Sequence, residues 1–76
     1  MEYLEELSTG DCFELNGSYY IVTTDFKKNG YKLCLDLKTG YGKWLKPDES
    51  VENIDIFTFD KDSNMMPIKE RKKEQS

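Results

Sequence analysis

Residues 12–45 form the stretch CFELNGSYYIVTTDFKKNGYKLCLDLKTGYGKWL, which the dipeptides Asn16-Gly17, Asn29-Gly30 and Thr39-Gly40 interrupt at three points. Asn-Gly between alternating segments is the strongest short-range hairpin signal, because both residues tolerate the positive φ of a type I′ turn. If each dipeptide is a two-residue loop, the stretch contains four antiparallel strands at about 12–15, 18–26, 31–37 and 41–46.

The three loops also predict how the strands pair. Phe13 is expected to face Tyr20, Phe26 to face Leu33 and Leu35 to face Trp44. Side chains alternate between the two faces of a strand, so a wrong register would scatter the apolar residues over both faces. The predicted register collects on one side a core of Phe13, Leu15, Tyr20, Val22, Thr24, Phe26, Leu33, Leu35, Leu37 and Trp44.

The flanking segments complete the predicted fold. The acidic N-terminal segment, residues 1–7, is expected to form one helical turn or an extended lead-in, and residues 51–59 a fifth strand. Residues 60–76 are expected to form a flexible, polar and partly basic tail, outside a domain of residues 1–59. Five short strands must cover one another's apolar face, which favours an all-β antiparallel meander curled into a small barrel similar to the SH3 type. An open sheet covered by a terminal helix is the alternative.

The opening of the chain also resembles a known group of proteins. Its pattern is Leu-x-x-Leu-x-x-Gly-Asp-x-Phe-x-Leu-Asn-Gly-x-x-Tyr-x-Val, formed here by Leu4, Leu7, Gly10, Asp11, Phe13, Leu15, Asn16, Gly17, Tyr20 and Val22. It is similar to small SH3-like barrel proteins of bacteriophages and bacterial mobile elements. The resemblance implies a fold and an origin, and it assigns no catalytic or binding residue.

Charge and hydropathy narrow the classes of function. The chain has 76 residues, 15 of them acidic and 11 basic, and a formal net charge of −4. An acidic balance argues against sequence-independent nucleic-acid binding, which needs Lys and Arg against the phosphates. No apolar run approaches the roughly 20 residues that span a bilayer, and the acidic N-terminus is unlike a signal peptide. We therefore expect a cytoplasmic protein that does not enter a membrane.

Reactive groups are few. The chain has no His, which removes the commonest general base and the commonest metal ligand. Cys12 and Cys34 are expected to be reduced thiols on the face opposite the core, Cys12 facing Ile21 and Cys34 facing Asp25. No Gly-rich phosphate loop or nucleophile motif is present. These observations predict a protein that is not an enzyme and that holds no metal or cofactor.

The face opposite the predicted core gives the leading functional hypothesis. It is expected to carry an apolar stripe, with Leu45 facing Cys34, that binds a protein partner. The predicted partner-binding residues are Tyr19, Ile21, Cys34, Leu45, Phe57 and Phe59. The alternative is structural, with the N-terminal segment or the apolar residues 65–68 folded over this face as a second small core.

Two further functions stay open at this stage. Exposed Tyr and Lys residues form a possible platform for single-stranded nucleic acid, made of Lys28, Tyr31, Lys32, Tyr41 and Lys43. The second open function is capture of a small ligand by a homo-oligomer, in which small barrels assemble through their edge strands. Neither the partner nor the oligomeric state follows from the sequence.

Overall fold

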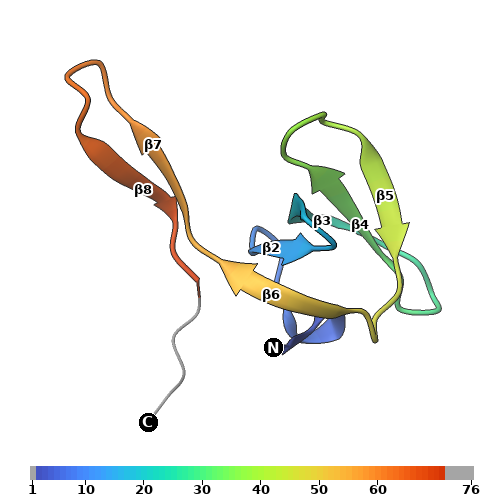
Figure 1. Cartoon of the computed structure of the whole chain (residues 1–76). Coiled ribbons are helices and arrows are strands. Elements are labelled where there is room, and N and C mark those ends of the chain that lie inside the picture. Colours follow the sequence, from blue (N-terminus) through green and yellow to red (C-terminus); the bar gives the residue numbers. More distant parts are fainter. Residues whose placement is uncertain (1, 72–76) are drawn as a thin grey trace, which may run out of the picture.

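The computed structural model describes residues 2–71 and shows an all-β chain, as predicted (Figure 1). One 3-10 turn, η1, spans Leu4–Glu6 and confirms the predicted N-terminal turn. The strands are β1 (Glu2–Tyr3), β2 (Cys12–Leu15), β3 (Ser18–Phe26), β4 (Lys32–Asp36), β5 (Gly42–Leu45), β6 (Ser50–Ile54), β7 (Ile56–Phe59) and β8 (Met65–Lys69).

These strands form two antiparallel sheets and not one closed barrel. The larger sheet has the order β1-β6-β2-β3-β4-β5, and β7 pairs with β8 in a separate two-stranded sheet. Within residues 2–71 the edge strands β1 and β5 do not pair, so the larger sheet is curled but open. The predicted count of five strands is wrong. The predicted fifth strand is divided at Asp55 into β6 and β7, which belong to different sheets, and β1 and β8 lie outside the five predicted strands.

The core lies on the concave side of the larger sheet, and η1 helps to close it. Leu4 N donates to Glu49 O at 2.9 Å, and Lys32 Nζ donates to Leu7 O at 2.6 Å. These bonds hold the N-terminal segment against the turn before β6 and against β4. The buried apolar residues are Leu4, Leu7, Phe13, Tyr20, Val22, Cys34, Leu45 and Val51.

The first hairpin follows the prediction. Phe13 pairs with Tyr20, and their rings stack with centroids 5.4 Å apart. Asn16 and Gly17 have φ of 52° and 83°, the positive values that a two-residue primed turn requires. Cys12 faces Ile21 as expected.

The second hairpin differs from the prediction by a shift of register. Lys27 N donates to Tyr31 O, so three residues and not two form the loop, and a second irregularity lies between Val22 and Phe26. Phe26 therefore pairs with Lys32, and Val22 pairs with Cys34. Because an odd shift exchanges the two faces of a strand, Cys34 lies in the core.

In the third hairpin the pairing of β4 with β5 is shifted by two residues from the prediction. Because the shift is even, residues that were predicted to share a face of this strand pair still share one. Asp36 N donates to Tyr41 O, and the Asp36 carboxylate accepts from the backbone N–H groups of Lys38 and Thr39. This longer loop places Leu33 opposite Trp44 and Lys32 opposite Leu45. The predicted pairings of Leu35 with Trp44 and of Cys34 with Leu45 are wrong, since Gly42 faces Leu35 and Lys43 faces Cys34.

The shifts change the predicted core. Phe13, Tyr20 and Val22 are buried as expected, and Leu15 packs against them in part. The other predicted core residues, Thr24, Phe26, Leu33, Leu35, Leu37 and Trp44, are exposed or half-buried. The segment expected to be a tail contains β8; its last residues, 72–76, lie outside the described residues.

Candidate functional site

The first candidate surface is the side of the larger sheet that faces away from the core. Cross-strand partners share a face, and Ile21 pairs with Leu35 while Leu33 pairs with Trp44. Tyr19 is two residues before Ile21, and Leu37 is two residues after Leu35. We call this set the outer face: Tyr19, Ile21, Leu33, Leu35, Leu37 and Trp44.

The outer face is apolar and open to solvent. Tyr19, Leu37 and Trp44 are 48%, 44% and 39% exposed. Leu33 and Leu35 pack close over Gly42, where an added Cβ would lie 3.0 Å from Leu33 Cδ1. Lys27 Nζ lies 4.6 Å from the centre of the Trp44 ring, a cation–π contact that places a positive charge at the rim.

The second candidate surface is the β7–β8 hairpin, residues 56–69, which we call the arm. It projects from the body after β6, and its strands pair only with each other (Figure 1). Five of its large apolar side chains are 45–68% exposed: Phe57, Phe59, Met65, Met66 and Ile68. A two-stranded hairpin of this kind is at best marginally stable by itself in water.

The pairing of the arm gives it one continuous apolar side. Phe57 pairs with Pro67, and Phe59 pairs with Met65. These four residues, separated along each strand by two positions, share a face that we call the arm face. Met66, opposite Thr58, lies on the reverse side.

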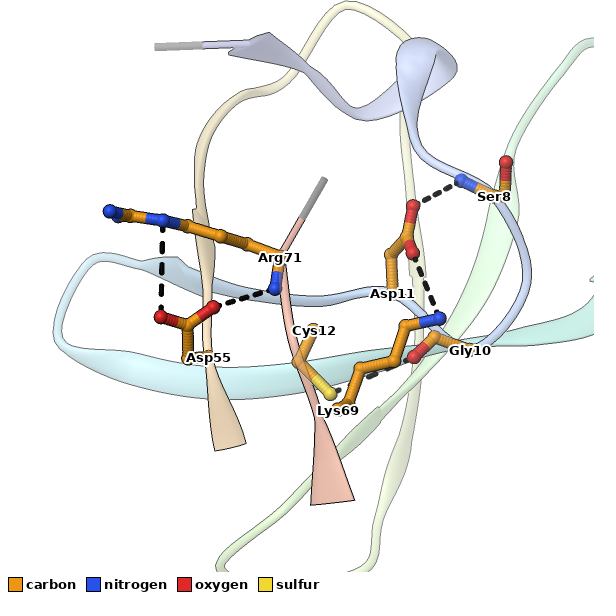
Figure 2. Close-up of polar contacts among 7 residues, drawn as sticks. All are labelled: Ser8, Gly10, Asp11, Cys12, Asp55, Lys69 and Arg71. Atoms are coloured by element: carbon orange, nitrogen blue, oxygen red, sulfur yellow. Dashed lines mark hydrogen bonds and ion pairs between the residues drawn. The ribbon is translucent and has the colours of Figure 1, made fainter. Parts of the chain in front are cut away.

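A buried carboxylate joins the arm to the body (Figure 2). Asp11 is 2% exposed; its Oδ2 accepts from Ser8 N at 2.8 Å, and its Oδ1 lies 3.5 Å from Lys69 Nζ at the end of β8. At the base of the arm, Asp55 Oδ1 accepts from Arg71 N at 2.6 Å. These contacts fix where the arm leaves the sheet.

The sequence-predicted partner-binding residues divide among three places. Phe57 and Phe59 lie on the arm, and Tyr19 and Ile21 lie on the outer face. Cys34 and Leu45 are buried in the core, at 0% and 5% exposure, so their predicted place on the outward surface is wrong.

The structural alternative is confirmed in part. Leu4 and Leu7 of the N-terminal segment lie in the same buried cluster as Cys34 and Leu45, two residues of the predicted second face, but this cluster is the main core and not a second one. Residues 65–68 do not cover that face and form β8 in the arm. The sequence reasoning missed Leu33, Leu35, Leu37 and Trp44 as surface residues, because the odd shift of register between β3 and β4 exchanges them with the core. The apolar character of residues 65–68 was a usable signal for the arm.

The residues of the nucleic-acid alternative do not gather on one surface. Lys28 and Tyr31 lie in the loop before β4, while Tyr41 lies in the loop after it, at the opposite end of the strand. Lys32 Nζ is engaged by Leu7 O, and Lys43 lies opposite Cys34 on β5. A strand of five residues separates the two loops by roughly 16 Å.

The remaining chemical groups suggest little reactivity. Cys12 and Cys34 are free thiols, and burial raises the pKa of the Cys12 thiol and raises that of Cys34 to about 11. Both thiols are therefore protonated at neutral pH, whereas nucleophilic cysteines need the thiolate. Residues 2–71 contain no cluster of three or more His, Cys, Asp or Glu placed to hold a metal ion.

Two further observations bear on identity and location. Comparisons of the chain with family models, curated proteins and solved structures found no match. In the part of the chain that the structure describes, no helix is long and apolar enough to cross a bilayer.

Proposed function

We propose that the chain is a non-enzymatic protein-binding module and that the arm is its binding element. The observation that carries the proposal is the solvent exposure of the arm face, where Phe59 and Met65 are 68% and 63% exposed on a hairpin without a covering layer. Aromatic residues and Met are enriched in protein interfaces and depleted from ordinary surfaces. A projecting hairpin of this composition is suited to insert into a groove on another protein.

The more specific form of the proposal is a phage-encoded inhibitor or modulator of a host protein, built on an SH3-like scaffold and acting in the cytoplasm. Its support is the resemblance of residues 4–22 to phage and mobile-element proteins, together with the acidic excess of the chain. Carboxylates can occupy a basic surface of a partner, where they compete with its other anionic ligands.

Affinity capture from bacterial lysate, with and without nuclease, tests the proposal. We expect the tagged wild-type chain to retain a stoichiometric protein after nuclease treatment and Phe59→Asp to lose it. Phe26→Asp is the matched control, because Phe26 is 74% exposed on the body and away from the arm. Capture by both variants, or by neither the wild type nor the control, contradicts a role for the arm.

The comparison of samples with and without nuclease also tests the nucleic-acid alternative. Recovery that disappears after nuclease, and that weakens steeply between about 50 and 200 mM salt, identifies a nucleic-acid binder. The dispersal of Lys28, Tyr31 and Tyr41 over opposite ends of β4 speaks against that result.

A further inference from the structure

The arm face and the outer face are two apolar surfaces with residues that are well exposed among residues 2–71, and we infer that they cover each other between two copies. In this pair the arm of each copy lies on the outer face of the other. The inference rests on the proposed function, because it names the occupant of the same arm: a second copy of this chain.

The base of the arm is fixed to its own body. Only Asp55 separates β6 from β7, and β6 is held on both sides by pairing with β1 and β2. The Lys69–Asp11 ion pair and the bond from Arg71 N to Asp55 hold the base in place. The outer face lies on β3, β4 and β5, which β2 separates from β6 in the sheet order. We therefore place the covering surface on another molecule.

The two surfaces match in character. The arm face presents two Phe side chains, a Met and a Pro, and the outer face presents aliphatic side chains beside one Trp and one Tyr. At Gly42 the side chains of Leu33 and Leu35 lie close over the backbone of β5, so the aliphatic surface continues to the edge of the sheet. Aromatic residues packed against such apolar surface are typical of the central contacts of stable interfaces.

The available area is sufficient for a stable dimer only when both arms dock. Phe57, Phe59 and Met65 are 45–68% exposed and each offers on the order of 100 Å² of surface, to which the exposed Pro67 adds a smaller area. One docked arm with its acceptor surface then buries about 800 Å², and two bury about 1,600 Å², the standard size of a specific interface. When each arm docks on the other copy, the dimer has two-fold symmetry and is a closed assembly. No arm is then left free to bind a third copy.

The charges at the ends of the two surfaces are complementary. The arm tip carries Asp60 and Asp62 against one Lys61. The rim of the outer face carries Lys27 over the Trp44 ring, with Lys28 in the same loop. When an arm lies with its tip toward Trp44, its carboxylates meet these ammonium groups.

Sedimentation equilibrium of the full chain from low micromolar to near-millimolar concentration tests the inference, with Trp44 emission as a second readout. Trp44 is the only Trp in the chain and belongs to the outer face. We expect a monomer–dimer equilibrium in which Trp44 emission shifts to shorter wavelength as dimer forms. Phe59→Asp should weaken the dimer about a hundredfold, because each of two docked arms loses roughly tenfold, whereas Phe26→Asp should leave it unchanged.

Complementation makes the test specific for exchange of arms. Leu35→Asp disrupts the outer face and leaves the arm face intact. Phe59→Asp disrupts the arm face and leaves the outer face intact. Mixed together, they should associate through one intact docking, more weakly than the wild type but more strongly than either variant alone. Circular dichroism of each variant checks that the body is folded; Trp44→Glu replaces Leu35→Asp if the latter is unfolded.

Three results overturn the inference. They are a wild-type monomer at all concentrations, an association that Phe59→Asp does not affect, and an assembly that grows beyond the dimer. If the chain is a monomer and still captures a lysate protein through Phe59, the second copy is not the occupant of the arm, and the proposed function stands. A monomer without arm-dependent capture overturns both.

Discussion

At the scale of single residues, Phe13 and Phe26 differ in how far they are covered. Phe26 is opposite Lys32, which faces the buried Leu45, but it is the last residue of β3 and remains exposed. Phe13 is 0% exposed and Phe26 is 74% exposed, although both were expected in the core. Phe13→Ala should lower the free energy of unfolding by about 3–5 kcal/mol, since it leaves a cavity against Tyr20. Phe26→Ala should change it by less than about 0.5 kcal/mol. Urea denaturation followed by circular dichroism measures both, and equal losses would contradict the observed difference in burial.

The Cys34 thiol predicts a loss of stability in alkali. Burial raises its pKa to about 11 from an ordinary value of 9.0, so the folded state holds the proton that the unfolded chain releases. This contribution is fully present below pH 9 and is lost as the pH rises toward 11, on the order of 1–2 kcal/mol.

Denaturation of wild type and Cys34→Ala over this pH range checks the prediction. The variant is less stable throughout, because it leaves a small cavity. Its free energy of unfolding should nevertheless fall less between pH 9 and pH 11. Parallel curves for the two proteins would show that other groups cause the alkaline loss.

At the scale of elements, the turn of the arm depends on one carboxylate. Asp60 Oδ1 accepts from Asp62 N and from Asn64 N, each at 2.9 Å. The bond from Asn64 N is the largest cause of a lowered Asp60 pKa. A lowered pKa stabilises the turn above the ordinary value of 3.8, and this contribution disappears as the pH falls through the folded-state value.

Asp60→Ala should therefore loosen the arm and leave the body intact. We expect faster amide exchange in β7 and β8 at neutral pH, with unchanged exchange in β2 and β3. Asp62→Ala is the matched control, because the hydrogen bond of Asp62 to this turn comes from its backbone N–H. Equal acceleration in both variants would contradict the role of the Asp60 carboxylate.

The elements also show where sequence reasoning succeeds and where it ends. The Asn16-Gly17 hairpin was predictable down to its register, because a primed two-residue turn permits only one pairing. The Asn29-Gly30 and Thr39-Gly40 dipeptides instead lie in longer loops. The sequence between Val22 and Phe26 contains no local pattern that predicts the irregularity in pairing there. The arm was hidden because its second strand contains Pro67 and follows a polar turn, which resembles the start of a tail.

At the scale of the whole molecule, the body and the arm are coupled through a partly buried ion pair. Asp11 is almost completely buried, whereas the Lys69 side chain is 40% exposed. Loss of the ammonium group would leave a buried carboxylate next to Cys12 with less compensation, and it would also remove the tie from the body to β8. One substitution should therefore affect two parts of the molecule that belong to different sheets.

Lys69→Gln should lower the free energy of unfolding of the body by about 1–2 kcal/mol, less than for a fully buried pair because Lys69 is partly solvated. It should also accelerate amide exchange throughout the arm. Lys61→Gln is the control, since it removes the same charge at the exposed tip of the arm. A destabilised body with an unchanged arm would mean that the pair stabilises Asp11 locally, and that Asp55 and Arg71 alone set the direction of the arm.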